Sequence, residues 1–289
     1  MIASVVVPAL DAQLTIVQQL AALDAQDVAE PFEVIVVDNG SSDGTAAVVA
    51  GYRPRRYDLR LVSEPRRGVN RARNAGVRVA HGDAVLLCDS DDQVGDGWLR
   101  SLLGALAPGV WVSGALSYER LNSARTRRIW GVPELPRTGS ARPGVDVGFG
   151  GNCGFSRDMW RRLGGFDDDL SGDGDETEFF LRAWDAGFVL RWVPEAVVHQ
   201  RLRPGLVGMA RRRYRQGRSQ VRMLAAAGGR LSGPGLSRAA ELRAVAWLML
   251  ATPKYLLGDR RYQWLSSMSG HLGRLRGLRD SVGSATRSR

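Results

Sequence analysis

Carboxylates gather at one point of the sequence, where they would leave the end of a buried strand together. Asp89, Asp91 and Asp92 stand in the run DSDD, directly after the apolar residues 84–88. Like charges this close repel each other unless a cation neutralises them. Mg²⁺ or Mn²⁺ does so, and such ions bind one or two carboxylates together with phosphate oxygens and water. The run therefore indicates a metal-bound diphosphate, although acidic turns without a ligand are also common.

A second acidic cluster covers residues 172–178, a glycine-rich segment that leads into an amphipathic helical pattern. Carboxylates in the first turn of a helix often cap backbone N–H groups and complement the helix dipole. A carboxylate in this place can also act as a general base that takes the proton from an attacking hydroxyl group. Composition alone does not choose between these two interpretations.

The elements that position these residues follow from alternating apolar and helical patterns. Strands are expected at residues 3–7, 33–37, 59–62 and 84–88, with helices at 14–23, 45–50 and 69–80 between them. Buried strands joined by helices predict βαβ units and a mostly parallel, Rossmann-like sheet. Ligands bind outside the carboxyl ends of strands in such sheets, and polar residues follow three of these strands. We expect the three strand ends to form one site.

The remaining chain divides into an irregular segment and a helical region. A further strand is expected at residues 110–116, followed by a segment rich in Pro, Arg and Gly up to about residue 148, which we interpret as an acceptor loop. Helices are expected at 209–226, 237–257 and 262–278. This pattern predicts a catalytic domain at residues 1–203, with halves at 1–107 and 108–203, and a basic helical extension at 204–289.

Composition indicates an ordinary globular protein, because 44% of the 289 residues are hydrophobic and 24% are charged. Cys88 and Cys153 have no spacing typical of a disulfide framework, so a reducing cytoplasmic location is expected. The first residues lack the basic region of a signal peptide and are typical of a strand.

Charge separates the two ends of the chain. Residues 200–289 hold 19 basic and 3 acidic residues, a net charge of +16, whereas residues 1–199 hold 21 basic and 27 acidic residues, a net charge of −6. The basic region suggests an anionic partner, which is a membrane surface, a polyanionic acceptor or nucleic acid. Its most apolar segment, 244–257, is too short to span a bilayer, so peripheral binding at the inner face of the membrane is expected. A helical lid or a homodimer interface explains the same pattern equally well.

Several segments together resemble the family 2 glycosyltransferases, which are inverting enzymes with the GT-A fold. The matching motifs are SVVVP (4–8), VIVVDNGSSDGT (34–45), GVNRARNAG (68–76), LLCDSDD (86–92) and LGGFD (163–167), which runs on to GDETEFFLR (174–182). Their order and spacing match the family over about residues 2–203. The resemblance implies an α/β catalytic domain that transfers a hexosyl group from a UDP-, GDP- or dTDP-sugar to the hydroxyl of an unknown acceptor.

The resemblance also assigns residues to the donor. It places Asp38 against the nucleotide, the stretch from Pro8 to Asp11 beside it, and either Arg71 or Arg73 on the base or the diphosphate. The full expected donor set is Pro8, Ala9, Asp11, Asp38, Asn39, Arg71, Arg73, Asn74, Asp89 and Ser90. Asp11 stands where the family often has Asn or Glu, which puts the role of Asp11 in doubt.

Metal, base and acceptor contacts are likewise implied by the resemblance. Asp89 falls on the ribose side, and Asp91 and His199 fall at the Mg²⁺ or Mn²⁺ ion. Register places Glu176 on the catalytic base, but the family's order of the acidic pair is reversed here, so Asp175 competes for this role. Gly151, Asn152 and Gly174 are expected on the acceptor side.

Two other classes of protein share some of these sequence features. A nucleotidyltransferase usually has a glycine- and lysine-rich phosphate loop, but Lys254 is the only lysine of the chain. The alternative function is a basic nucleic-acid- or membrane-binding protein that carries a catalytically inactive sugar-nucleotide-binding domain. No recognisable nucleic-acid motif accompanies the basic region, so binding to nucleic acid is disfavoured.

Overall fold

A computed structural model describes residues 3–134, 148–170, 176–226, 236–255 and 258–285. These residues form two compact units. The first contains the described residues up to Leu121, from 148 to Asp169 and Glu176–Arg201, together with Glu134. The second contains Asn122–Pro133, Leu170 and the described residues from Leu202 onwards. The division at Arg201 lies close to the expected end of the catalytic domain at residue 203, but Asn122–Pro133 joins the second unit.

The amino-terminal half of the first unit is a parallel sheet with helical crossovers. Its strands are β1 (Ala3–Ala9), β2 (Phe32–Asp38), β3 (Tyr57–Ser63) and β4 (Ala84–Cys88), and its helices are α1 (Ile16–Asp24), α2 (Thr45–Gly51) and α3 (Val69–Val79). The strands lie in the order β3-β2-β1-β4, and each neighbouring pair is parallel. Each expected strand and helix of this half is confirmed, with ends that differ by a few residues.

The second half of the unit departs from a purely parallel arrangement. It contains β5 (Gln93–Val94), α4 (Trp98–Ala105), β6 (Val110–Ser117), β7 (Asn152–Ser156), α6 (Arg157–Arg162), α7 (Glu176–Asp185) and β8 (Val189–His199). The sheet continues in the order β4-β7-β6-β8-β5, with β7 antiparallel to both of its neighbours. β6 and β8 are parallel, and β5 pairs antiparallel with the end of β8. The sheet is therefore mixed and combines parallel β1 to β4 with a reversed β7.

Aromatic side chains hold α7 against the sheet. Phe180 of α7 stacks on Trp111 of β6 with ring centroids 4.0 Å apart, and Phe179 packs against Phe166 with centroids 4.2 Å apart. All four rings are buried. Burial of such large apolar surfaces is the main stabilising term in a core. This packing fixes the position of Glu176, the first residue of α7.

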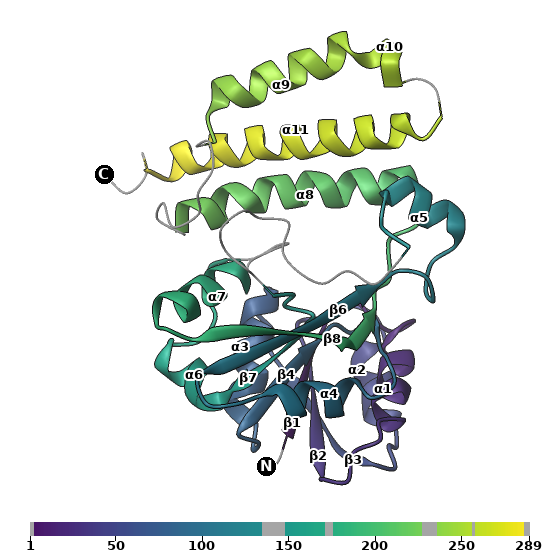
Figure 1. The fold of residues 1–289 in the computed structure, drawn as a ribbon, viewed down its shortest axis with the longest axis vertical. Coiled ribbons are helices and arrows are strands. Elements are labelled where there is room, and N and C mark those ends of the chain that lie inside the picture. The colour runs from purple at the N-terminus through teal and green to yellow at the C-terminus, as the bar shows by residue number, and fades with distance from the viewer. Residues whose placement is uncertain (1–2, 135–147, 171–175, 227–235, 256–257, 286–289) are drawn as a thin grey trace. The chain divides into compact units, whose positions relative to one another are not determined.

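The second unit is helical, as expected. It contains α5 (Ala124–Trp130), α8 (Gly205–Ala226), α9 (Arg238–Leu250), α10 (Thr252–Tyr255) and α11 (Arg260–Ala285), and α11 lies between α8 and α9 (Figure 1). The single helix expected at 237–257 is interrupted, because α9 ends at Leu250 just before Pro253, whose ring disfavours a continuous helix. None of the described helices is long and apolar enough to cross a membrane.

Glycines allow α8 and α11 to approach closely. A Cβ atom added to Gly273 would lie 2.0 Å from the backbone oxygen of Tyr214, and one added to Gly217 would lie 2.2 Å from the backbone oxygen of Gly270. Gly277 is similarly close to the backbone of Arg218. A side chain at any of these three positions would force the two helices apart.

Candidate active site

The carboxyl ends of β1, β2 and β4 lie side by side, as the sequence predicts. Ala9 is in register with Asp38, and the backbone N–H of Asn39 donates to the carbonyl of Ala9. Asp89 follows β4, the strand that pairs with the other edge of β1. Pro8, Ala9, Asp38 and Asp89 therefore share one edge of the sheet, where open α/β sheets bind their ligands.

Arg73 links this edge to the start of α7. Its Nη2 lies 4.0 Å from Oδ1 of Asp89, and its Nη1 lies 3.6 Å from Oε2 of Glu176. The Arg73 side chain is only 5% exposed, and its guanidinium group also lies over the ring of Phe166. The Asp89 side chain is 34% exposed and that of Glu176 17%, so solvent screens the pair with Glu176 less than the pair with Asp89. One buried cation thus joins a carboxylate expected on the donor side to the expected catalytic base.

A glycine turn before β7 covers this group of charges. A Cβ atom on Gly150 would lie 2.8 Å from Nη2 of Arg73 and 2.7 Å from Cγ of Glu176. A Cβ atom on Gly151 would lie 2.4 Å from Oδ2 of Asp89. The absence of side chains at these positions leaves room for Asp89, Arg73 and Glu176 to meet. Gly151, expected on the acceptor side, is therefore in direct contact with the donor-side carboxylate.

The loop from Asp89 to Asp92 is held in place by Gln19 and Arg201, for which the sequence indicated no role, and by Asp92, which the sequence placed in the carboxylate run. The amide of Gln19 on α1 donates to the carbonyl of Asp89 and accepts from the N–H of Val94. Asp92 accepts from the backbone N–H of Arg201, whose Nε in turn donates to the carbonyl of Asp91. Asp92 therefore positions the loop. Gln19 is a polar residue on the apolar stripe of α1, between Ile16 and Leu20, and this position in the sequence indicates a buried side chain that needs hydrogen-bond partners.

Asp91 and His199, the residues expected at the cation, lie on neighbouring segments of the backbone. His199 is in register with Gln93, two residues after Asp91, so the two backbone segments are neighbours. Asp91 is exposed, whereas Nδ1 of His199 is buried and has no hydrogen-bond partner among the described residues. Burial, followed by the charge of Arg120, lowers the pKa of His199 and favours the neutral ring that binds metals.

The described residues contain no cluster of three or more His, Cys, Asp or Glu side chains that could hold a metal without help. Mg²⁺ and Mn²⁺ do not require such a cluster, since one or two protein ligands and the oxygens of a phosphate complete the coordination. The side chains present thus fit a cation that arrives with a diphosphate.

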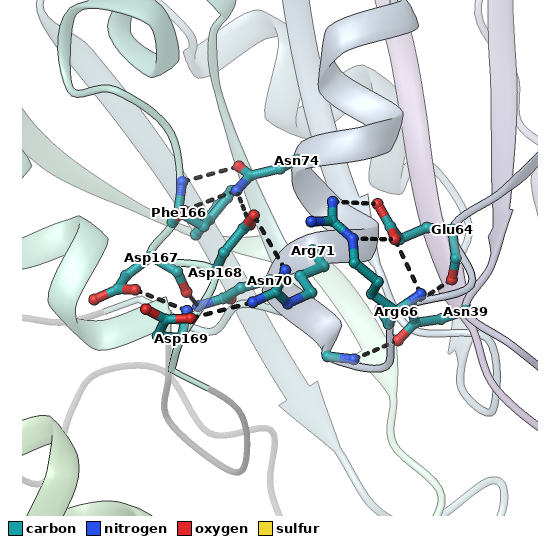
Figure 2. A network of polar contacts seen from close by, with 11 residues as sticks. Asn39, Glu64, Arg66, Asn70, Arg71, Asn74, Phe166, Asp167, Asp168 and Asp169 are labelled. Atoms are coloured by element: carbon teal, nitrogen blue, oxygen red, sulfur yellow. Dashed lines mark hydrogen bonds and ion pairs between the residues drawn. The ribbon is translucent and has the colours of Figure 1, made fainter. Parts of the chain in front are cut away.

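Arg71 and Asn74 have partners away from the strand ends (Figure 2). Arg71 forms ion pairs with Asp168 and Asp169. The Asn74 amide donates to Asp168 and to the carbonyl of Phe166, and its oxygen accepts from the N–H of Phe166. Asn74 is buried and its polar atoms are occupied, so the geometry gives it a structural role in place of the expected donor contact. Of the two arginines, Arg73 is the one beside Asp89.

Asn39 and Asn152 are also structural in this geometry. The Asn39 side chain accepts from the N–H of Gly68 and donates to the carbonyls of Glu64 and Arg66, so it holds the loop before α3 (Figure 2). Asn152, expected on the acceptor side, is fully buried. Its amide donates to the carbonyls of two neighbouring strands, and its oxygen accepts from the indole of Trp98. Neither side chain is available to an acceptor or donor.

The other expected site residues have different environments. Asp11 has a positive φ of 51° and accepts from the N–H and hydroxyl of Ser42, so it joins the loops after β1 and β2. Ser90 is buried. Gly174 and Asp175 lie outside the described residues, as does the part of the expected acceptor loop at 135–147.

A family model described as glycosyl transferase family 2 matches residues 4–164, and one described as glycosyl transferase family group 2 matches residues 134–272. The chain belongs to glycosyl transferase family 2 and has the mixed α/β architecture of GT-A glycosyltransferases.

Particular relatives agree with this family. The succinoglycan biosynthesis protein ExoM of Rhizobium meliloti (strain 1021) is 30% identical over 222 residues, which is 72% of this chain and 70% of ExoM. The glycosyltransferase AglE of Haloferax volcanii is 24% identical over 76% of this chain and 73% of AglE.

Solved structures show the same fold. The mannosyltransferase PcManGT of Pyrobaculum calidifontis, in complex with GDP-Man and Mn²⁺, is similar with a TM-score of 0.66 and 23% identity over 96% of this chain and 87% of that chain. TarS 1–349 of S. aureus, in complex with UDP-GlcNAc, is similar with a TM-score of 0.54 and 16% identity over 96% and 92% of the two chains.

Proposed function

We propose that this glycosyltransferase moves a hexosyl group from a nucleotide diphosphate sugar to an acceptor hydroxyl, with inversion at the anomeric carbon and with a divalent cation. The observation that carries the proposal is the buried Arg73, which lies between Asp89 and Glu176. Arg73 joins the donor half of the proposed site to the acceptor half. Asp89, at the end of β4, belongs to the donor half, and Glu176, the first residue of α7, belongs to the acceptor half. An inactive binding domain would not need a carboxylate at this second position.

The donor would lie along the carboxyl ends of β1, β2 and β4. Asp38 and Asp89 supply carboxylates that can accept from base and ribose groups, and Pro8 and Ala9 form the wall between them. PcManGT was solved with GDP-Man, and TarS 1–349 with UDP-GlcNAc, so the base of the donor in this chain is left to experiment.

Asp91 and His199 would hold the Mg²⁺ or Mn²⁺ ion together with the donor diphosphate. When bound, the cation offsets negative charge on the departing nucleoside diphosphate. This assignment is supported by the register of His199 with Gln93 and by the buried Nδ1 of His199, which has no hydrogen-bond partner within the described part of the chain. PcManGT, which shares the fold, was solved with Mn²⁺.

Glu176 would act as the general base. Its carboxylate takes the proton of the acceptor hydroxyl while the acceptor oxygen bonds to the anomeric carbon and the bond to the diphosphate breaks on the opposite face. Arg73 would hold the Glu176 carboxylate in place through its ion pair. The electron pair of the broken bond remains on the diphosphate, so no covalent intermediate with the protein is needed.

A matched set of variants tests this proposal. UDP-, GDP- and dTDP-sugars are first screened, with and without Mn²⁺, for an increase in the melting temperature. Donor hydrolysis, in which water replaces the acceptor, is then measured. Glu176→Gln should retain the donor-dependent shift and lose about 100-fold or more in hydrolysis, whereas Asp91→Asn should lose the part of the shift that depends on Mn²⁺.

Asp175→Asn is the control for the identity of the base. If Asp175→Asn loses hydrolysis and Glu176→Gln does not, Asp175 is the base. If no donor shifts the melting temperature or is hydrolysed, while DNA binds tightly, the proposed function is wrong.

A further inference from the structure

Apolar residues occur all round helix α9, and those on one face are covered within the second unit. Val245 and Leu248 are buried against α11, where they pack with Met268, Trp264 and Leu275. Glu241, one turn earlier on the same face, is also buried. This spacing of three to four residues accounts for the attachment of α9 to α11.

The rest of the α9 surface exposes large apolar side chains. We define the α9 outer face as Leu242, Trp247, Met249 and Leu250, whose exposed fractions range from 50% to 83%. Because successive residues of a helix are rotated by about 100°, these side chains spread over the exposed half of α9, with Arg243 between Leu250 and Trp247. Single exposed apolar residues are common on proteins, but four on one short helix indicate an interaction surface. A helix of 13 residues is about 20 Å long. It is therefore too short to span a bilayer but long enough to lie along its surface.

The surroundings of the α9 outer face are basic. Arg238, Arg243 and Lys254 are exposed on α9 and α10, and Arg260 and Arg261 are exposed at the start of α11. Few negative charges offset them, because residues 200–289 contain only Glu241, Asp259 and Asp280 as acidic residues.

Each of these three acidic residues already has a basic partner. Glu241 pairs with His271 and Arg274, Asp259 with Arg128, and Asp280 with Arg218 and Arg276. The α9 outer face thus lies among positive charges that no acidic residue of 200–289 is left to neutralise.

We propose that the α9 outer face docks the protein on an anionic lipid bilayer. Leu242, Met249 and Leu250 would enter the boundary between headgroups and acyl chains, and Trp247 would lie at the headgroup level, where its ring and N–H are both accommodated. Arg243 and Lys254 would contact anionic headgroups, each basic residue adding to the attraction. This surface is independent of the transfer site in the first unit.

Two other occupants fit the α9 outer face less well. A second copy of the chain in an isologous contact would bring the same basic residues of both copies, Arg243 and Lys254 among them, close together, and this repulsion opposes a dimer. A nucleic acid would match the basic residues but would leave Trp247, Met249 and Leu250 against a phosphate backbone, which gives apolar side chains no favourable contact. An anionic bilayer satisfies both the charges and the apolar side chains.

Vesicle sedimentation of the full chain tests the proposal. Vesicles of phosphatidylcholine with and without phosphatidylglycerol are used, without donor or acceptor. The wild-type protein should sediment with the anionic vesicles and much less with pure phosphatidylcholine. Trp247→Ser and Leu250→Ser should each reduce the partition coefficient about tenfold, as the loss of one inserted apolar side chain implies. Arg243→Glu combined with Lys254→Glu should reduce binding to the anionic vesicles alone.

Trp184→Ser is the matched control, because Trp184 of α7 and Trp247 are both 58% exposed. Trp184→Ser should bind vesicles as the wild type does, and circular dichroism should show that all variants are folded. Equal losses for Trp184→Ser and Trp247→Ser would overturn the proposal, as would equal binding of the wild type to both kinds of vesicle. A dimer in light scattering that Leu250→Ser converts to a monomer, without vesicle binding, would assign the face to a second copy. Donor hydrolysis is measured separately, so failure here leaves the proposed function untouched.

Discussion

The two units of the molecule are held together by different means. In the first unit the strands β1, β2 and β4 bury almost every side chain, and the aromatic residues of α7 complete the core. In the second unit the buried apolar cluster shared by α9 and α11 contains only Val245, Leu248 and Met268. Further stabilisation comes from the close backbone contact between α8 and α11, from a buried ion cluster, and from buried apolar residues of α5 and α8 such as Trp130, Met209 and Met223. The second unit exposes four large apolar side chains on the single helix α9, whereas the core of the first unit positions a site.

Glycines show the difference between the two units most clearly, because each unit contains a helix glycine whose Cβ position is occupied by a neighbouring atom. In the first unit a Cβ atom on Gly76 would lie 2.3 Å from Cγ1 of the Val6 side chain. In the second unit a Cβ atom on Gly273 would lie 2.0 Å from the backbone oxygen of Tyr214. A side chain can shift within a core at some cost, but a backbone atom moves only when its whole helix moves.

Gly273→Ala should therefore cause the largest loss of stability, about 3 kcal/mol in the free energy of unfolding of the second unit. Gly76→Ala should cost about 1–2 kcal/mol in the first unit, because Val6 can adjust. Urea denaturation followed by circular dichroism measures both effects. Gly104→Ala is the control, since nothing lies within 4 Å of its Cβ position, and it should not destabilise. A smaller loss for Gly273→Ala than for Gly76→Ala would contradict the proposed role of the α8–α11 contact.

Each unit also contains a buried glutamate beside an arginine and a histidine. Glu241 accepts from Nε of Arg274 at 3.0 Å and lies 2.6 Å from Nδ1 of His271, and no hydroxyl or backbone N–H is among these partners. Glu33 pairs with Arg60 and His81 but also accepts from the hydroxyl of Ser4 and the backbone N–H of His81. Among the described residues, the partners found for the Glu241 carboxylate are thus the side chains of Arg274 and His271.

Glu241→Gln should destabilise the second unit by about 2 kcal/mol, because it leaves Arg274 and His271 close together without their shared anion. Thermal unfolding measures the loss, and Arg276→Gln is the control, since its ion pair with Asp280 is half exposed and should be worth at most about 0.5 kcal/mol. Equal effects of the two substitutions would mean that the buried cluster contributes no more than a surface ion pair.

In the first unit, the strands and helices were easier to predict from the sequence than the pairing and direction of the later strands. Continuous apolar runs identify strands such as residues 84–88 without knowledge of their neighbours. The reversed direction of β7 and the pairing of β5 with β8 depend on tertiary packing, which no local pattern encodes. His199 comes beside the segment after β4 only through that pairing. The close approach of α8 and α11 could not be predicted, because Gly273 and Gly277 mark a small-residue face but do not identify the helix that packs on it.

The candidate site shows the same limit at single residues. Arg71 and Arg73 are two positions apart on α3, so their side chains point in different directions from the helix. Sequence alone left both on the donor. In the structure Arg71 pairs with Asp168 and Asp169, and Arg73 pairs with Asp89 and Glu176. Asn74 and Asn152 were expected to bind ligands, but polar residues on a buried face also serve to satisfy backbone groups.

The smallest expected effect concerns Glu33 and its response to pH. Burial raises the pKa of Glu33, but hydrogen bonds from Ser4, the His81 backbone and Arg60 lower it more, so the folded-state pKa lies below the ordinary value of 4.5. The unfolded state then binds more protons near that pH, so stability from Glu33 is present above pH 4.5 and is lost as the pH falls through the folded-state pKa. Glu33→Gln should cost about 1.5 kcal/mol at neutral pH, and the difference from the wild type should narrow below pH 4.5. Urea denaturation across this range measures the difference, and one that stays constant with pH would show that the charge of Glu33 contributes no stability.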